Sequence, residues 1–595
     1  MVVVGSTMRL HTHAIIPGGR GFLTKSRYPY LKTASSFSST PEQEEYDYII
    51  VGGGTAACPL AATLSQKYSV LVLERGGSPY GNWNVSYLQN FHISLANTSP
   101  NSTSQPFIST DGVINARAKV LGGGTCINAG FYTRASHSFV KDAGWDFEVV
   151  NESYPWVEKQ IVQWPKLAPW QTALRNGLLQ AGISPFNGYT YDHIKGTKIG
   201  GTIFNKHGFR RTAADLLLAG NPKNLQVLLH ATVQKILFNT TGTSTLTETV
   251  VFQLKAHFLD DDLYSLVSHF QMKHEMHFVH LMALIPEPTP CTIGSPQLLL
   301  LSGIGPKNDL KKQGITVILD NPYVGKGLSD NPMNSIFIPT KKPVEQSLIE
   351  TVGITAFGSF IEASSGFGQS SESIRCHHGI MSAELGQLST IPPSQRSLDV
   401  IKDYVRTKHE LPTEAFRGGF ILEKIDGPLS VGELTLLNTD IDSTPSITFN
   451  YFSHPADLQR CVHGIRTIEK IIQTKQFADL AEDDSDTLEI LLNMSVRANV
   501  NLIPKHTNDT ASLEQFCRDT VITIWHYHGG CHVGKVIDHK YRVLGVDNLR
   551  VIDSSTFNRS PGTNPQATVM MLGRYMGTKI LRERSRDQQW KRERV

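Results

Sequence analysis

The fold is decided by residues 46–57, which read Tyr-Asp-Tyr-Ile-Ile-Val-Gly-Gly-Gly-Thr-Ala-Ala. A short run of β-forming apolar residues leads directly into a glycine turn of the form G-x-G-x-x-A that begins at Gly52. This order predicts a strand, a tight turn and a helix over 59–66 whose first backbone amides face a phosphate. A side chain at Gly52 or Gly54 would hold phosphates away from the backbone. The stretch therefore predicts an α/β dinucleotide-binding domain.

A carboxylate at the expected spacing supports this interpretation. A second predicted strand, residues 69–73, ends at Glu74, twenty positions after Gly54. In dinucleotide-binding units, an acid at this place binds the ribose. It favours an unphosphorylated ribose, as in FAD or NAD, over NADP. Glycine turns of this form occur often by chance, but the strand, helix and acid around this one disfavour a purely structural turn.

Length and charge exclude several classes of protein. The chain has 595 residues, 40% hydrophobic and 18% charged, which is enough for two or more packed domains. A net charge of +3 over this length lacks the dense basic face that nucleic-acid binding requires. The basic excess lies in the first 41 residues and in the tail after 581. No stretch approaches the ~18 uninterrupted apolar residues of a transmembrane helix.

Four further blocks carry chemistry. Residues 119–131 (Lys-Val-Leu-Gly-Gly-Gly-Thr-Cys-Ile-Asn-Ala-Gly-Phe) predict a second amide-rich loop, suited to closing over a dinucleotide or its ring. Residues 294–306 predict a capped apolar helix ending in a glycine turn. Residues 525–531 read Trp-His-Tyr-His-Gly-Gly-Cys. Residues 562–566 read Gly-Thr-Asn-Pro-Gln and precede a predicted helix over 567–581.

Together, and in this order, these blocks resemble the glucose-methanol-choline (GMC) oxidoreductases over residues 46–581. Within that family the likeness is closest to plant HOTHEAD-like proteins and slightly weaker to mandelonitrile lyases, on runs at 186–193, 196–204 and 560–567. The resemblance implies an α/β fold in which an FAD-binding, Rossmann-like domain accompanies a second, α+β substrate domain. It implies a leader over 1–41, disordered or targeting; FAD-domain segments 42–150, 196–325 and 519–581; substrate-domain segments 151–195 and 326–518; and a frayed tail over 582–595.

The resemblance also implies FAD as the cofactor and assigns its contacts. Those near the nucleotide are Gly52, Gly54, Thr55, Ala56, Ala57, Glu74, Arg75 and Val233. Those in the second loop are Val120, Gly124, Asn128, Ala129, Gly130 and Phe131. Those near the flavin ring are Trp525, His526, Asp553, Pro565 and Gln566. No metal site is predicted, because there is no C-x-x-C pair and His274-Glu275-Met276-His277 is one residue short of the zinc spacing His-Glu-x-x-His.

His526 and Asn564 are the implied catalytic pair. Oxidising an alcohol requires removal of the hydroxyl proton while hydride leaves the carbon for flavin N5, and an imidazole suits the first task near neutral pH. Asn564 cannot be that base, but its amide can hydrogen-bond the substrate oxygen as it becomes alkoxide-like. FAD carries the electron chemistry. For His528 and His532 we favour a structural role.

Two reaction classes are compatible with the family. Mandelonitrile lyases carry a second His and a Tyr where this chain has Asn564 and Ile524, so we favour alcohol oxidation over cyanohydrin cleavage. The likeness to HOTHEAD-like proteins implies long-chain ω-hydroxy fatty acids, oxidised on the way to cuticle dicarboxylic acids, as the substrate class. The expected partner is therefore a small-molecule alcohol, and a monomer is favoured.

Residues 255–291 depart from the family pattern. They hold five histidines among many Phe, Leu and Met, where relatives have strands of the FAD domain. We expect the loss of these strands to leave sheet edges unpaired. A second hypothesis follows, namely a non-catalytic protein that is deficient in FAD.

The cysteines and sequons bear on the cellular compartment. Seven cysteines are too few for a disulfide scaffold, but the resemblance implies one disulfide between Cys461 and Cys517, as in the lyases. Eight N-x-S/T sequons, more than chance supplies, favour secretion. The N-terminus lacks the apolar centre of a signal peptide, and its acid-free composition leaves a plastid transit peptide as the alternative.

Overall fold

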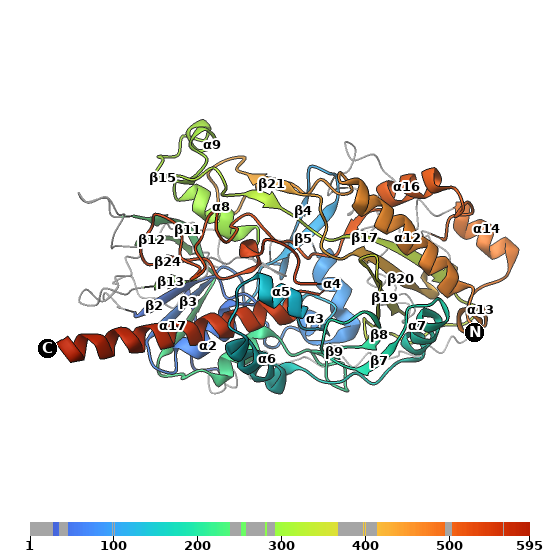
Figure 1. Ribbon diagram of the computed structural model, residues 1–595, viewed down its shortest axis with the longest axis horizontal. Helices are drawn as coiled ribbons and strands as arrows, with labels where there is room; N and C mark the ends of the chain where they lie inside the picture. The colour runs from blue at the N-terminus through green and yellow to red at the C-terminus, as the bar shows by residue number, and fades with distance from the viewer. Residues whose placement is uncertain are drawn as a thin grey trace, which may run out of the picture.

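The computed structural model describes residues 28–34, 46–97, 99, 101–238, 251–256, 280–282, 292–366, 397, 399, 413–493, 502–562 and 564–594. Two large sheets organise these residues, one parallel and six-stranded, the other mostly antiparallel and seven-stranded. They lie towards opposite ends of the molecule, and the C-terminal helix α17 runs along the body and extends beyond it (Figure 1).

The parallel sheet has the order β1 (Leu31–Thr33), β10 (Leu225–Leu229), β3 (Val70–Glu74), β2 (Tyr48–Val51), β13 (His280–Met282) and β24 (Leu549–Arg550). Every residue of β2 and β3 is buried, as expected of central strands in a covered parallel sheet. The buried helix α2 (Ala57–Leu64) packs against α17 (Gln566–Arg594). The predicted strand, turn and helix are therefore confirmed, although the helix begins two residues before the predicted start.

Residues 28–34 form part of the fold, so the predicted leader is not disordered there. Strand β1 pairs in parallel with β10, with Leu31 opposite Val227. Tyr28 and Tyr30 are buried, and the Tyr28 ring stacks on Tyr80 with centroids 3.7 Å apart. A strand of three residues is too short to show a hydrophobic period, which is why the sequence did not reveal it. The rest of the predicted leader lies outside the described residues.

Strand β13 corrects the expectation of unpaired sheet edges. Its backbone pairs in parallel with β2 on one side, where Leu281 lies opposite Ile49, and with β24 on the other. Strand β12 (Val251–Ala256) pairs antiparallel with β11 (Ala231–Leu237). Backbone hydrogen bonds in a sheet do not require particular side chains, so an atypical sequence still completes this one. The predictions about 257–279 and 283–291 fall outside the described residues.

The second large sheet has the order β23 (Ile522–Thr523), β17 (Pro332–Pro339), β20 (Gly418–Ile425), β19 (Ser359–Ser365), β18 (Thr351–Ile354), β8 (Gly196–Ile199) and β7 (Phe186–Tyr189). Helices α7 (Pro169–Gln180) and α12 (Pro455–Ile472) pack against it. The disulfide between Cys461 on α12 and Cys517 on α16 (Thr510–Asp519), implied by the family resemblance, is present, with the Cα atoms 6.3 Å apart.

Smaller elements connect and cover the two sheets. The short strands are β4 (Ser104–Ile108), β5 (Ile114–Ala118), β6 (Phe131–Tyr132), β9 (Gly201–Thr202), β14 (Ile304–Gly305), β15 (Leu319–Asp320), β16 (Lys326–Leu328), β21 (Gly432–Thr435) and β22 (Ser446–Thr448). The remaining α-helices are α3 (Trp83–Ser86), α4 (Phe91–Ala96), α5 (His137–Asp142), α6 (Phe147–Ile161), α8 (Gly294–Leu301), α9 (Lys307–Lys312), α13 (Lys475–Ala478) and α14 (Ser485–Asn493). The 3-10 turns are η2 (Leu88–Asn90), η3 (Gly123–Cys126), η4 (Ala213–Ala219), η8 (Thr413–Phe416) and η9 (Ser554–Thr556).

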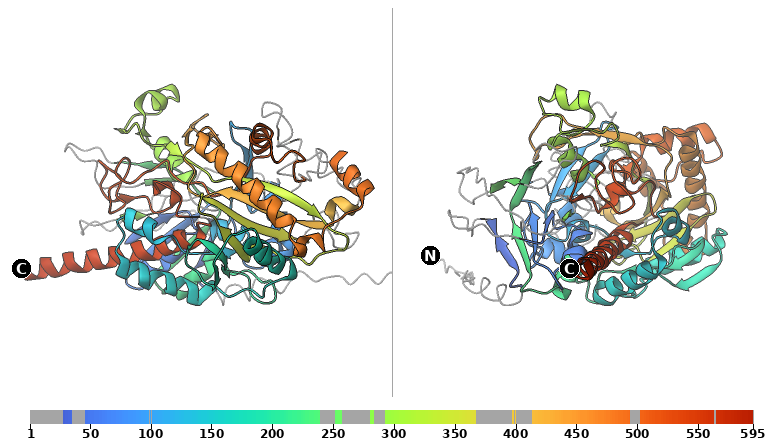
Figure 2. Two further views of the ribbon diagram at one scale, coloured as in Figure 1. Left: turned by 45° about the vertical axis from the view of Figure 1, so that its right-hand side comes forward. Right: turned by 60° about the vertical axis from the view of Figure 1, so that its left-hand side comes forward.

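The predicted tail begins inside α17 and is anchored rather than frayed at its start. Glu583 pairs with Arg550 at 2.8 Å. The Arg584 guanidinium pairs with Asp47 at 2.8 Å and lies 3.8 Å from the centre of the Tyr68 ring. The last turns of the helix project beyond the body (Figure 2). No helix in the described part of the chain is long and apolar enough to span a membrane, and no three metal-ligating side chains cluster there.

Candidate active site

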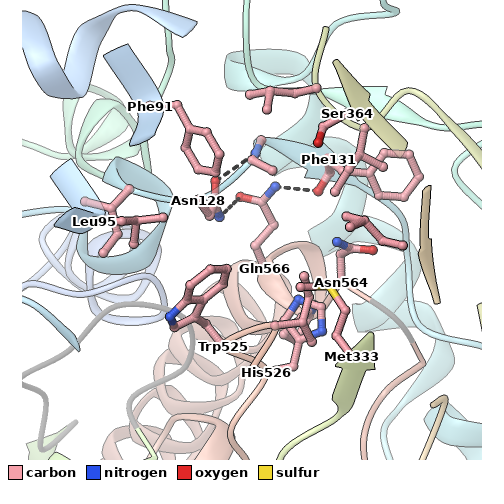
Figure 3. Close-up of a pocket in the computed structure, with 18 of the residues that line it drawn as sticks. Phe91, Leu95, Asn128, Phe131, Met333, Ser364, Trp525, His526, Asn564 and Gln566 are labelled. Atoms are coloured by element: carbon pink, nitrogen blue, oxygen red, sulfur yellow. Dashed lines mark hydrogen bonds between the residues drawn. The ribbon is translucent and has the colours of Figure 1, made fainter. Parts of the chain in front are cut away.

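A small cavity joins segments that lie far apart in the sequence. Residues 128–131, which follow η3, meet Trp525 and His526, which follow β23, and Asn564, Pro565 and Gln566 at the start of α17 (Figure 3). The remaining walls are mostly apolar and comprise Phe91, Leu95, Ala116, Ile127, Met333, Ser335, Leu348, Ile349, Ser364, Leu422, Ile522 and Ile524. The structure therefore brings the predicted ring-side residues together, with the exception of Asp553.

His526 is a buried imidazole on the wall of this cavity. Only 6% of the residue is exposed, and its Nδ1 has no hydrogen-bond partner among the residues that the structure describes. The preceding Trp525 has a φ of +59°, which is uncommon outside glycine and directs the chain sharply after β23. Burial, reinforced by Lys424 and then His528, lowers the pKa of His526 well below its usual value. The imidazole is therefore neutral at neutral pH and able to accept a proton.

Asp330, just before β17, holds the backbone of His526 in place. Its carboxylate accepts hydrogen bonds from the His526 N–H at 2.8 Å and from the hydroxyls of Thr523 and Tyr451, each at 2.6 Å. Burial raises the pKa of Asp330 to about 6. Our sequence reasoning missed this residue, because it belongs to none of the blocks that carry chemistry. The available signal was a polar run, Ser329 to Asn331, directly before the stretch 332–339 that forms β17.

Asn564 is held by Lys424, and Lys424 is held in turn by Glu362; the sequence analysis missed both charged side chains. The Lys424 ammonium donates to Asn564 Oδ1 at 3.0 Å. Lys424 and Glu362 pair at 2.9 Å with both side chains wholly buried. Charged residues are almost never fully buried unless they are paired. The available signal was charged residues inside β-forming stretches, namely Glu362 after Phe360-Ile361 and the adjacent pair Glu423-Lys424.

A network of side-chain amides holds the part of the cavity wall that is formed by residues 128–131. Gln566 donates through Nε2 to the Phe131 carbonyl at 2.5 Å and accepts from Asn128 Nδ2 at 3.0 Å (Figure 3). Asn128 Oδ1 accepts in turn from the Gly130 N–H at 3.0 Å and from Arg210 at 3.1 Å. Burial lowers the pKa of Arg210 to about 9. These bonds hold the loop after η3 against the first residue of α17.

The two glycine-rich loops predicted from the sequence pack against each other. The Gly122 N–H donates to the Gly53 carbonyl at 2.7 Å. A Cβ at Gly123 would come within 2.9 Å of the Gly54 Cα, so this approach of two backbones requires glycine. Gly52, with a φ of +84°, makes the turn from β2 towards α2. Val120 and Gly124 belong to the same junction, Val120 through a bridge to Gly77 and Gly124 within η3.

Glu74 lies at the end of β3 beside this junction, where the ribose-binding acid is predicted. Its carboxylate accepts from the Gly53 N–H at 2.7 Å and the Gly76 N–H at 2.6 Å, and burial raises its pKa. The Thr55 hydroxyl at the start of α2 is buried and meets no hydrogen-bond partner within the described ranges. These groups fit a dinucleotide. The Glu74 carboxylate can accept from ribose hydroxyls, the Thr55 hydroxyl is left without a protein partner in the described part of the chain, and the two glycine loops expose backbone rather than side chains.

The other predicted contacts occupy separate positions. Ala56 and Ala57 are buried at the start of α2, and the buried Arg75 donates to Gln105 at 3.0 Å. Val233 lies on β11. The Asp553 carboxylate accepts from the Ser295 hydroxyl at 2.5 Å, and burial raises its pKa to about 7. The cofactor contacts themselves stay predictions.

Comparison with known proteins gives the class. Two family profiles described as GMC oxidoreductase match residues 46–261 and 428–573. The chain therefore belongs to the GMC oxidoreductase family, whose members are generally FAD-dependent oxidoreductases acting on CH–OH groups. The family and the fold class predicted from the sequence are confirmed.

Individual proteins show how similar this chain is to other members of the family. The chain is 56% identical to Protein HOTHEAD from Arabidopsis thaliana over 567 residues, covering 94% of this chain and 93% of that protein. It is 43% identical to an (R)-mandelonitrile lyase-like protein of the same organism, covering 94% and 93%. The solved structure of pyridoxine 4-oxidase from Mesorbium loti has a TM-score of 0.68 at 20% identity, covering 90% of this chain and 98% of that one, which shows a shared fold.

Proposed function

We propose that this protein binds FAD and oxidises the CH–OH group of a long-chain alcohol. The observation that carries the proposal is that His526 and Asn564 line one mostly apolar cavity together with residues 128–131. Bound FAD supplies the acceptor for the hydride. Gly52 to Ala57 and Glu74 would hold its nucleotide, and Asn128 to Phe131, Pro565 and Gln566 would hold its ring.

The side chains of the cavity would carry out the proton chemistry. His526, neutral because burial and a nearby cation lower its pKa, accepts the hydroxyl proton at Nε2 or Nδ1. The Asn564 amide donates a hydrogen bond to the substrate oxygen as negative charge develops there. The apolar walls exclude water, which strengthens both interactions.

The lining also supports a lipid-like substrate. Of the described residues around the cavity, His526 is the only one with an ionisable side chain. A carboxylate buried there would lack a cationic partner, which is costly. We therefore infer that an ω-hydroxy fatty acid enters with its hydroxyl end first and keeps its carboxylate outside the cavity.

Cyanohydrin cleavage is the second candidate, because a lyase-like relative shares 43% of its sequence with this chain. Ile524 and Asn564, the positions where the lyase resemblance places Tyr and His, both line the cavity. Ile524 offers no polar atom for proton transfer. This difference at the cavity wall favours oxidation.

One set of measurements separates the candidates. The purified protein is expected to absorb at about 450 nm, as oxidised flavin does, and to lose that absorbance under anaerobic conditions with 12-hydroxydodecanoic acid. A colourless protein would support the FAD-deficient alternative. Release of benzaldehyde from mandelonitrile with the flavin spectrum unchanged would reverse our order of the two reactions.

We further infer that the protein is secreted. The disulfide Cys461–Cys517 requires an oxidising compartment, and sequon asparagines at 101, 151, 508 and 558 are exposed. Expressed in leaf cells, the protein is expected to migrate faster in a gel after enzymatic removal of N-glycans. Unchanged migration together with import into plastids would favour the transit-peptide alternative.

A further inference from the structure

The seven-stranded sheet carries two opposite charges to the wall behind Asn564. Lys424 on β20 and Glu362 on β19 come from neighbouring antiparallel strands, and their side chains are 0% exposed. A buried ion pair is often no more stabilising than apolar residues of the same size. Stability alone therefore does not account for burying this pair in the sheet.

The contacts of the pair determine which way the Asn564 amide faces. An ammonium group can only donate, so Lys424, 3.0 Å away, meets the amide oxygen. Glu362 accepts from Lys424 at 2.9 Å and so fixes the position of that donor. The contact with Lys424 selects one of the two orientations that an isolated Asn amide can adopt. The amide nitrogen is then left to donate elsewhere, and Asn564 lines the cavity.

We propose that Lys424 and Glu362 are positioning residues that make Asn564 present an N–H, rather than its carbonyl oxygen, to the substrate oxygen. This inference rests on the proposed function, which places an alcohol oxygen between His526 and Asn564. An amide oxygen in the same place would repel the developing negative charge, whereas an N–H stabilises it.

The same cation acts on the proposed base. Lys424 is the second cause, after burial and ahead of His528, of the lowered pKa of His526. Asp330 binds the backbone N–H of His526 rather than the imidazole, and Glu362 is bonded to Lys424. One ion pair thus orients the hydrogen-bond donor and favours the neutral form of the base.

The test replaces the two charges together. K424M/E362M keeps the side-chain volume and leaves no single charge buried and unpaired. We expect it to fold, to retain flavin absorbance, and to show the Asn564 amide in more than one orientation in a crystal structure. The rate of flavin reduction by 12-hydroxydodecanoic acid should fall about 10- to 100-fold, with a smaller change in KM.

A double-mutant cycle distinguishes positioning from general support. In an N564A background, K424M/E362M should change the rate by less than about twofold, because the amide on which the pair acts is gone. E423Q is the matched control, since Glu423 is a buried carboxylate of β20 that accepts from Ser359 at 2.7 Å and does not line the cavity. Its rate should match that of the unaltered protein.

The charge swap K424E/E362K keeps an ion pair. It tests the positioning role in the same way if K424M/E362M does not fold. It should turn the amide over and lower the rate at least as much. Equal losses with and without Asn564, or an unchanged amide orientation in either variant, would overturn the inference. If the unaltered protein does not oxidise the alcohol, the proposed function fails, and the crystal structures still decide the positioning role.

Discussion

Two regions of the molecule are built in different ways. One is the junction of the two glycine-rich loops, and the other is the catalytic wall, by which we mean the part of the cavity wall formed by His526 and Asn564 with the side chains that hold them. At the junction, partners lie nearer in the sequence: the Gly53 N–H and the Glu74 carboxylate are 21 positions apart, and Gly53 and Gly122 are 122 − 53 = 69 apart. At the wall, Asp330 and His526 are 196 positions apart, and Lys424 and Asn564 are 140 apart. The junction needs particular residue types because backbones approach closely. The wall needs only a partner of the right charge, which many segments can supply.

This difference teaches where each region is vulnerable. Any side chain added to the junction displaces the backbone that would hold a dinucleotide. The wall tolerates changes that preserve charge and volume, and responds to changes that leave a buried group unpaired. Substitutions at the wall should therefore alter catalysis with FAD still bound, and substitutions at the junction should alter FAD affinity.

H526A should give the largest difference between the effect on catalysis and the effect on FAD binding. Losing the base should lower the rate of flavin reduction by alcohol about 10²- to 10⁴-fold, while the absorbance of bound flavin is retained. Anaerobic stopped-flow absorbance measures the rate. H532A is the control, because His532 lies in the same segment and does not line the cavity; its rate should change less than about threefold. Undiminished reduction by H526A would refute its role.

Removing the disulfide should loosen the wall without affecting the junction. C461A/C517A opens a link between positions 56 residues apart, and the free energy of unfolding should fall by roughly 4 kcal/mol. Urea denaturation at saturating FAD measures it. Because α12 packs on the seven-stranded sheet, FAD affinity should stay the same. A matching loss of FAD affinity would mean that the two regions are coupled.

Replacing Asp330, whose carboxylate accepts from the His526 backbone N–H, tests whether that contact fixes the position of the imidazole. D330N replaces one carboxylate oxygen by a donor that faces the donors of Thr523 and Tyr451, so about 1–3 kcal/mol of stability should be lost. The rate of flavin reduction should fall as His526 loses its fixed position. Thermal unfolding and the same stopped-flow assay measure both effects. D330E, which keeps the charge, should recover part of the rate.

At the junction, G123A should weaken FAD binding. Gly123 has a φ of +57°, and its added Cβ would meet the Gly54 Cα at 2.9 Å. We expect about a tenfold loss of FAD affinity by flavin fluorescence. Gly144, with a φ of +67° and open space around it, provides the control G144A. That variant has the same backbone strain without the collision, so an equal loss of affinity would argue against close packing as the cause.

The smallest effect is on the pH profile. A protonated imidazole cannot accept the substrate proton, and burial, Lys424 and His528 lower the pKa of His526. The acid limb of kcat/KM should therefore lie below the ordinary histidine value of about 6.5. Activity should persist as the pH falls through that value and disappear only at lower pH. K424M/E362M should move the limb upwards, since it removes the cation.

The sequence was informative where local backbone geometry is demanding. It predicted β2, the glycine turn, α2, β3 and the apolar helix α8, because each shows a hydrophobic pattern or a glycine requirement within a few residues. It missed β1 and β13, since three residues carry no period. In the site, it located His526 and Asn564 through short blocks and missed Asp330, Lys424 and Glu362, which belong to no block.

By itself, the sequence determined the family, the α/β class, the glycine junction and the pair of catalytic candidates. Each depends on residue types that a short segment of backbone requires. Only the tertiary structure decided that a buried lysine and glutamate flank Asn564 and that Asp330 holds His526. Those contacts depend on strand order and register in the seven-stranded sheet, and they join residues 62, 140 and 196 positions apart.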